Sequence, residues 1–119
     1  MLFSFEHLNV YQDSMTLVSE VYRMTNSFPT HERFALSQQL QRAIVSVPSN
    51  IAEGCGRRSL KEKAHFMEIA AGSLMESYCQ LQIARRLEYI TDQQLTNLKR
   101  TIFSVAHQLE ALRKSFCAP

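Results

Sequence analysis

Residues 91–116 read TDQQLTNLKRTIFSVAHQLEALRKSF, and their periodicity decides the fold. Large apolar residues recur at alternating steps of three and four, which places them on one face of an α-helix. Thr91 stands at an N-cap position and Gln94 follows at the spacing of a capping box. Arg113 and Lys114 fall where they stabilise the negative end of the helix dipole. We therefore predict a helix over residues 92–116. Its apolar face consists of Leu95, Leu98, Ile102, Val105, Leu109, Leu112 and Phe116.

Three earlier segments share this period and predict helices over residues 6–25, 33–54 and 60–88. Turn formers around Phe28-Pro29 end the first of them, and Ser59 with Glu62 forms a second capping-box pattern before the third. Gly72 lies inside the third helix, where it favours close approach of a neighbouring helix. The predicted apolar faces are Leu8, Tyr11, Met15, Val18 and Tyr22; then Leu36, Leu40, Ala43, Val47 and Ile51; then Leu60, Ala64, Met67, Ala71, Leu74, Tyr78 and Leu81.

Pro48 falls inside the second of these segments. The apolar positions keep their phase across it, and a helix that broke and restarted would have no reason to do so. We predict one helix, kinked at Pro48, which ends at Gly54 in a left-handed conformation. The alternative is two helices that meet at residues 47–49.

The composition agrees with an all-α domain. The chain has 119 residues with only 3 Gly and 3 Pro, too few for a turn-rich sandwich or barrel. Short loops between helices of this length predict an antiparallel, up-down-up-down four-helix bundle as a single domain over residues 1–119. The three cysteines are widely spaced, and no apolar run is long enough to span a bilayer. With no signal-peptide pattern at the start, we expect a cytoplasmic protein.

The formal net charge is +2, and its distribution is uneven. Residues 31–63 hold six Arg and Lys against three Glu, and the excess gathers where the second predicted helix gives way to the third. Arginines beside a helix N-terminus favour phosphate or carboxylate. We therefore predict a nucleic-acid-binding patch formed by Arg42, Arg57, Arg58, Lys61 and Lys63.

A polar stripe of Ser46, Asn50 and Glu53 runs beside the apolar face of the second helix, in line with Arg42. It could recognise a ligand together with the basic patch. Alternatively, Arg42 and Glu53 are solvated or paired within the bundle, while Ser46 and Asn50 satisfy backbone groups freed by Pro48. The stripe alone does not decide between these hypotheses.

Patterns typical of enzymes are missing from the sequence. It contains no phosphate-binding glycine loop, no nucleophile elbow and no repeated Glu-x-x-His for a bundle metal site. We therefore predict a protein that is not an enzyme and needs no cofactor or metal.

The sequence resembles the bacterial four helix bundle protein family, also called the ribosomal RNA intervening-sequence protein family. Most specific is residues 39–54, QLQRAIVSVPSNIAEG, preceded by Phe28-Pro29 with Glu32 and followed by Gly56-Arg57. The family commonly has Trp where this chain has Tyr11. Further matching positions are Phe5, Leu8, Val10, Gln12, Phe66, Ala70, Gly72, Ser73, Leu74 and Glu76.

This resemblance implies a left-handed four-helix bundle, similar to the accessory protein of diversity-generating retroelements. That protein assembles as a homopentameric barrel and binds nucleic acid beside a reverse transcriptase. The resemblance thus implies RNA or DNA, and a partner protein such as a reverse transcriptase, as candidate partners. It also implies a pentamer.

Two functions remain open from the sequence. The first is a non-enzymatic, oligomeric bundle that binds structured nucleic acid through the basic patch. The alternative is a protein-interaction scaffold or adaptor that binds no nucleic acid. Apolar residues outside the four predicted faces favour a homo-oligomer in either case, because they would leave a patch larger than a monomer tolerates. They are Phe3, Phe5, Phe66, Ile69, Tyr89 and Ile90.

Overall fold

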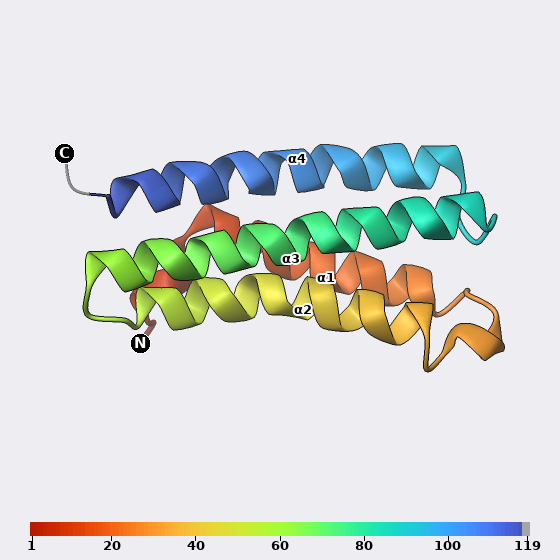
Figure 1. The fold of residues 1–119 in the computed structure, drawn as a ribbon, viewed down its shortest axis with the longest axis horizontal. Coiled ribbons are helices and arrows are strands. Elements are labelled where there is room, and N and C mark those ends of the chain that lie inside the picture. The colour runs from red at the N-terminus through yellow and green to blue at the C-terminus, as the bar shows by residue number, and fades with distance from the viewer. Residues whose placement is uncertain (118–119) are drawn as a thin grey trace.

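The computed structural model describes residues 1–117, and four α-helices make up most of them. Two short 3₁₀ helices, Ser4–His7 and Thr30–Glu32, precede α1 and α2, and the described part of the chain has no strand. Successive α-helices run in opposite directions (Figure 1), which confirms the predicted all-α, up-down-up-down bundle. The α-helices are α1 (Asn9–Thr25), α2 (Leu36–Cys55), α3 (Leu60–Arg86) and α4 (Asp92–Ser115).

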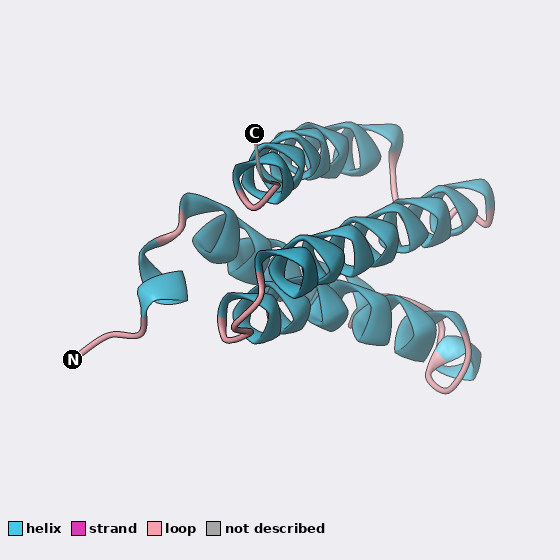
Figure 2. Ribbon diagram, turned by 60° about the vertical axis from the view of Figure 1, so that its left-hand side comes forward, coloured by secondary structure: helices cyan, strands magenta, loops and turns pink. Residues whose placement is uncertain are grey.

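The bundle is elongated, 46 × 24 × 23 Å, and it has two distinct ends. Its N-terminus, its α2–α3 loop and the end of α4 lie together at one end (Figure 1). The α1–α2 connection and the α3–α4 turn lie at the other end. Each helix packs on its neighbours in sequence, and α1 also meets α4 less closely. Figure 2 shows α3 between α2 and α4, so residues on α3 face two partners.

The first helix begins later and faces differently than predicted. Its α-helical turns start at Asn9, because residues 4–7 form a 3₁₀ helix instead. Met15 and Tyr22, predicted to be buried, are 43% and 41% exposed. The buried face is shifted by about one residue from the predicted face, and it includes Ser14. The Ser14 side chain can be buried because its hydroxyl donates a 2.7 Å hydrogen bond to the Tyr11 carbonyl. The buried residues of α1 are Val10, Ser14, Leu17, Val21 and Thr25.

The second helix runs without a break from Leu36 to Cys55 with Pro48 inside it, so the two-helix alternative is wrong. Gly54 is not a left-handed stop, since no glycine of the described chain has a positive φ. It is buried in the helix, and an added Cβ would lie 2.6 Å from the Phe66 Cβ and 2.6 Å from the Met67 Cε. The glycine is therefore needed because α3 passes so close to α2 at this point.

The third helix departs from prediction at three places. Gly72 is exposed and faces open space, so it does not accommodate a neighbouring helix within the chain. Leu60, predicted to be buried, is 52% exposed. The helix ends at Arg86, and Ile90 in the following turn is buried, so the predicted exposed pair Tyr89-Ile90 instead packs into the core.

The fourth helix begins as predicted. Thr91 accepts a hydrogen bond from the Gln94 amide, and the Gln94 side chain accepts one from the Thr91 amide, which completes the capping box. Arg85 and Asp92 form an ion pair across the α3–α4 turn. None of the helices within residues 1–117 combines the length and the apolar character needed to cross a membrane.

Candidate nucleic-acid interface

The α2–α3 loop holds two of the predicted basic residues, Arg57 and Arg58, at one end of the bundle, and Lys61 and Lys63 follow in the first turn of α3. Gly56 caps α2, and the Arg57 amide then donates to the Gly54 carbonyl, which turns the chain sharply. Ser59 caps α3 by accepting a hydrogen bond from the Glu62 amide. The reciprocal bond of a full capping box is not formed by Glu62. The loop is therefore tight, and its side chains project from a fixed backbone.

Arg57 is held by two contacts within the chain. Its guanidinium donates a 2.8 Å hydrogen bond to the Glu53 carboxylate, one turn earlier on α2. It also lies over the ring of Phe66, 4.7 Å from the centroid. Glu53 of the polar stripe thus neutralises one of the predicted phosphate-binding cations.

Lys63 is also engaged within the chain. Its ammonium donates a 2.8 Å hydrogen bond to the Cys55 carbonyl in the last turn of α2, where a cation stabilises the helix dipole. The same ammonium lies 5.9 Å from the ring centroid of Phe116 in α4. Burial raises the pKa of the Cys55 thiol above its usual range, and the nearby Lys63 charge opposes that rise. Lys63 therefore ties three helices together.

Arg58 and Lys61 have a different environment. Both are exposed, and neither forms an ion pair with any residue in the described range 1–117. Arg42 is also exposed, but it lies thirteen residues before the end of α2, about 20 Å away at the rise of an α-helix. The five predicted cations therefore do not form one patch. Arg57 is exposed too, but Arg58 and Lys61 are the cations near the loop that have no ion pair in the described chain.

The polar stripe is part of the packing between α2 and α3. The hydroxyls of Ser46 and Ser73 share a 2.8 Å hydrogen bond between the two helices. The Asn50 amide donates to the Ser46 hydroxyl at 2.8 Å and to the Ser46 carbonyl at 2.7 Å. Neither side chain bonds the carbonyl of Ile44, the group that Pro48 frees, so that part of the structural hypothesis is wrong. The stripe joins two helices within the chain.

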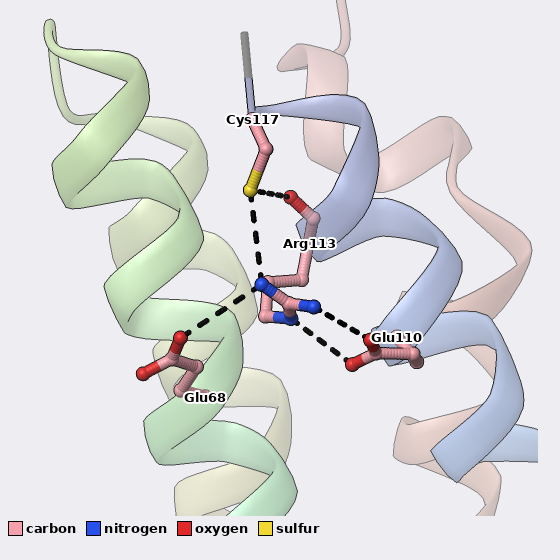
Figure 3. A network of polar contacts seen from close by, with 4 residues as sticks. All are labelled: Glu68, Glu110, Arg113 and Cys117. Atoms are coloured by element: carbon pink, nitrogen blue, oxygen red, sulfur yellow. Dashed lines mark hydrogen bonds and ion pairs between the residues drawn. The ribbon is translucent and has the colours of Figure 1, made fainter. Parts of the chain in front are cut away.

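The end of α4 adds charged residues that were predicted only to stabilise the helix dipole and were not included in the basic patch. Figure 3 shows Arg113 with two hydrogen bonds to Glu110, at 2.6 and 3.0 Å, and an ion pair of 4.0 Å to Glu68 on α3. The hydrogen bond from Arg113 holds the pKa of the Glu110 carboxyl below its usual range. Lys114, the next residue, is exposed. The antiparallel topology is the signal that could have placed this helix end beside the α2–α3 loop.

A pocket of about 450 Å³ lies between the first turns of α3 and the last turn of α4. Lys61, His65 and Arg113 line it together with Glu68, Phe116 and Cys117. The Cys117 thiol donates to the Arg113 carbonyl at 3.5 Å, so this thiol also belongs to the network at the helix end (Figure 3). Among the described residues, no three His, Cys, Asp or Glu side chains are grouped so that they could hold a metal ion.

Comparison with known protein families shows to which family the chain belongs. The model of the 23S rRNA-intervening sequence protein family matches residues 6–111, nearly all of the bundle. The chain belongs to this family.

A solved structure has a similar fold. The structure is similar to that of a protein of unknown function from the S23 ribosomal protein family of Bacteroides thetaiotaomicron, with a TM-score of 0.81 and 22% identity. The match covers 88% of this chain and 95% of the other chain. At that identity the likeness shows the fold alone. No curated protein matches the sequence.

Proposed function

We propose that this chain is a non-enzymatic bundle protein that binds structured nucleic acid at the end formed by the α2–α3 loop and the last turn of α4. The observation that carries the proposal is the placement of charge. Residues 53–68 and 110–114 together hold six Arg and Lys against four Glu, an excess equal to the whole formal net charge of +2. Elsewhere the chain is balanced.

The accessible cations at this end suit phosphate. Arg58 and Lys61 are exposed without ion pairs in the described chain, and Lys114 is exposed at the end of α4. Arg57 and Lys63 remain candidates, but each would have to share its charge with an internal partner. Such a surface recognises the phosphate backbone and the shape of a nucleic acid more than its base sequence. The family name refers to an rRNA intervening sequence, which supports structured RNA as the first ligand to test.

The test is a binding titration of a structured RNA across a range of salt concentrations. We expect affinity to fall steeply with salt, because phosphate contacts release counterions. Arg58→Gln/Lys61→Gln should weaken binding to every sequence and reduce the logarithmic salt slope by roughly 2. The matched control is Arg86→Gln/Arg100→Gln, which removes two exposed charges away from this end. Equal losses in the two double variants, or no binding of the unmodified protein at low salt, would contradict the proposal.

We also propose that the chain assembles as a homo-oligomer, with a pentamer as the expected size from the family resemblance. A groove of about 420 Å³ between α3 and α4 supports this, because its lining is almost wholly apolar. Phe103 and Met75 line this groove and are 64% and 49% exposed. Exposed apolar side chains that adjoin one another mark an interaction surface, whereas single ones are common on any protein. Of the apolar residues expected outside the predicted faces, Phe3 is 74% exposed and Ile69 is 38% exposed. Light scattering after size exclusion tests this, and a mass near one chain would contradict it.

The same groove favours the alternative function, a protein-interaction scaffold. In that case a partner protein, such as a reverse transcriptase, would cover Phe103, and a second copy of this chain would not. Co-purification with a polypeptide, weak salt dependence and no RNA binding would support the scaffold over the nucleic-acid-binding function.

A further inference from the structure

A pocket at the opposite end of the bundle has the features of a second site. It lies between the end of α1 and the start of α2, where the chain forms the connection at the right of Figure 1, and has a volume of about 480 Å³. Its lining is mainly polar, and it includes Thr25, Arg33, Phe34, Ser37, Gln38 and Gln41. The charged end described above contributes none of these residues.

Phe34 forms an exposed platform at the rim of this pocket. The side chain is 78% exposed, the largest exposed fraction of any phenylalanine in the described chain. The guanidinium of Arg33 lies 5.3 Å from its ring centroid, so a cation already stacks beside the ring. An aromatic ring in solvent next to an arginine is the arrangement on which unpaired nucleic-acid bases stack.

The wall of the pocket offers hydrogen-bonding groups that lack partners. Ser37 lines the pocket, and its hydroxyl, which forms no hydrogen bond within residues 1–117, is open to solvent and therefore to a ligand. The Gln41 amide nitrogen donates to the Thr25 hydroxyl at 2.9 Å, which orients the amide and leaves its oxygen as an acceptor.

The charge around the pocket favours an anionic ligand. Arg33 is exposed and has no ion pair within the described chain. The neighbouring Glu32 carboxylate is turned instead toward Tyr89, whose hydroxyl donates a 2.7 Å hydrogen bond to it. Arg33 is therefore available for a phosphate group.

We propose that this pocket binds a nucleotide with an unpaired base. The base stacks on Phe34, its polar edge meets Ser37 and Gln41, and its phosphate contacts Arg33. The nucleotide is either free in solution or an unpaired residue in a strand, and the chemistry of recognition is shared by both. This inference does not depend on the proposed function, because it uses other residues at the other end of the bundle.

The test measures binding of four probes to the full chain: AMP, UMP, ribose 5-phosphate and a labelled single-stranded oligonucleotide of ten residues. Saturable binding of AMP or UMP identifies a free nucleotide as a ligand. Binding of the oligonucleotide alone, if it is weakened by Phe34→Ala, identifies an unpaired base in a strand. Ribose 5-phosphate, which lacks the base, should bind much more weakly. Phe34→Ala should weaken binding roughly 10- to 100-fold, the usual loss when a stacked aromatic is removed.

The matched control is Phe3→Ala, which removes a similarly exposed phenylalanine at the other end of the bundle. Arg58→Gln/Lys61→Gln should leave binding of AMP and UMP unchanged within about 2-fold, which separates this site from the basic end. The proposal is overturned if ribose 5-phosphate binds as well as AMP, if Phe34→Ala and Phe3→Ala have equal effects, or if no probe binds. Circular dichroism of Phe34→Ala establishes that the variant is folded.

Discussion

The Tyr89 hydroxyl donates a 2.7 Å hydrogen bond to the Glu32 carboxylate, which joins the α3–α4 turn to the α1–α2 connection across 57 residues of sequence. The other Glu32 oxygen accepts from the Leu36 amide at 3.4 Å, at the start of α2. Tyr89 also packs against Phe28, with ring centroids 5.3 Å apart. One tyrosine thus fixes both connections at this end of the bundle.

This contact predicts a pH-dependent stability. The hydrogen bond from Tyr89 lowers the pKa of the Glu32 carboxyl. The contact therefore stabilises the fold at pH values above the usual pKa of glutamate, and this stabilisation is lost as the pH falls through the lowered pKa. Tyr89→Phe should therefore lower the melting temperature at pH 7, and the difference from the unmodified protein should disappear in acid. Thermal unfolding between pH 2 and 7 measures this. Tyr22→Phe is the control, and an equal effect there would show that the contact contributes nothing specific.

Gly54 and Gly72 should respond oppositely to alanine. Gly54→Ala places a methyl group 2.6 Å from the Phe66 Cβ and should destabilise the fold by about 1–3 kcal/mol. Gly72→Ala meets no atom within 4 Å and should stabilise the helix by about 0.5–1 kcal/mol. Urea unfolding of both variants measures the free energies of unfolding. A stabilised Gly54→Ala would show that α3 can move away from α2 at no cost.

Asn50 should prove structural. Asn50→Ala removes its two hydrogen bonds to Ser46 and should destabilise the fold by about 1 kcal/mol. RNA affinity and its salt slope should stay unchanged, because the Asn50 amide is engaged by Ser46, whose hydroxyl in turn bonds Ser73 on α3. Ser49→Ala, at an exposed position on the same helix, provides the control. A large loss of RNA affinity in folded Asn50→Ala would return the polar stripe to the binding site.

Glu53→Gln should increase RNA affinity at low salt. The substitution removes one negative charge from the basic end and weakens the ion pair that holds Arg57. Glu76→Gln changes the net charge equally at an exposed position in the middle of α3. Filter binding of both variants measures the difference. If they bind alike, the charge of Arg57 does not contribute to the interface.

Phe103→Ser/Met75→Ser should reduce the mass of the assembly. The two substitutions remove the most exposed apolar side chains of the α3–α4 groove and so the area that a second copy would bury. Phe34→Ser, at a similarly exposed phenylalanine outside the groove, should leave the mass unchanged. Light scattering at equal protein concentration compares them. An unchanged mass in the double variant would place the interface on another face.

The sequence predicted the helices well and their orientation less well. The run from Leu95 to Phe116 has one apolar face, so period alone identified both helix and core. In α1 the larger residues Met15 and Tyr22 were predicted to be buried, yet the structure exposes them and buries Ser14. A hydroxyl bonded to its own helix can be buried at little cost, and periodicity of large residues does not register it.

By itself, the sequence determined four helices, their antiparallel order and the loop at which basic residues gather, because these follow from local periodicity and short connections. The tertiary structure decided which cations are engaged within the chain: Glu53 and Phe66 hold Arg57, the Cys55 carbonyl holds Lys63, and Arg58 and Lys61 have no ion pair among the described residues. It also decided that Gly54 serves close packing and that Lys114 joins the basic end. Most of these features depend on how α3 folds back against α2 and α4, which the spacing of residues along a single helix does not specify. The Glu53–Arg57 pair is the exception, because its two residues lie four apart, one helical turn.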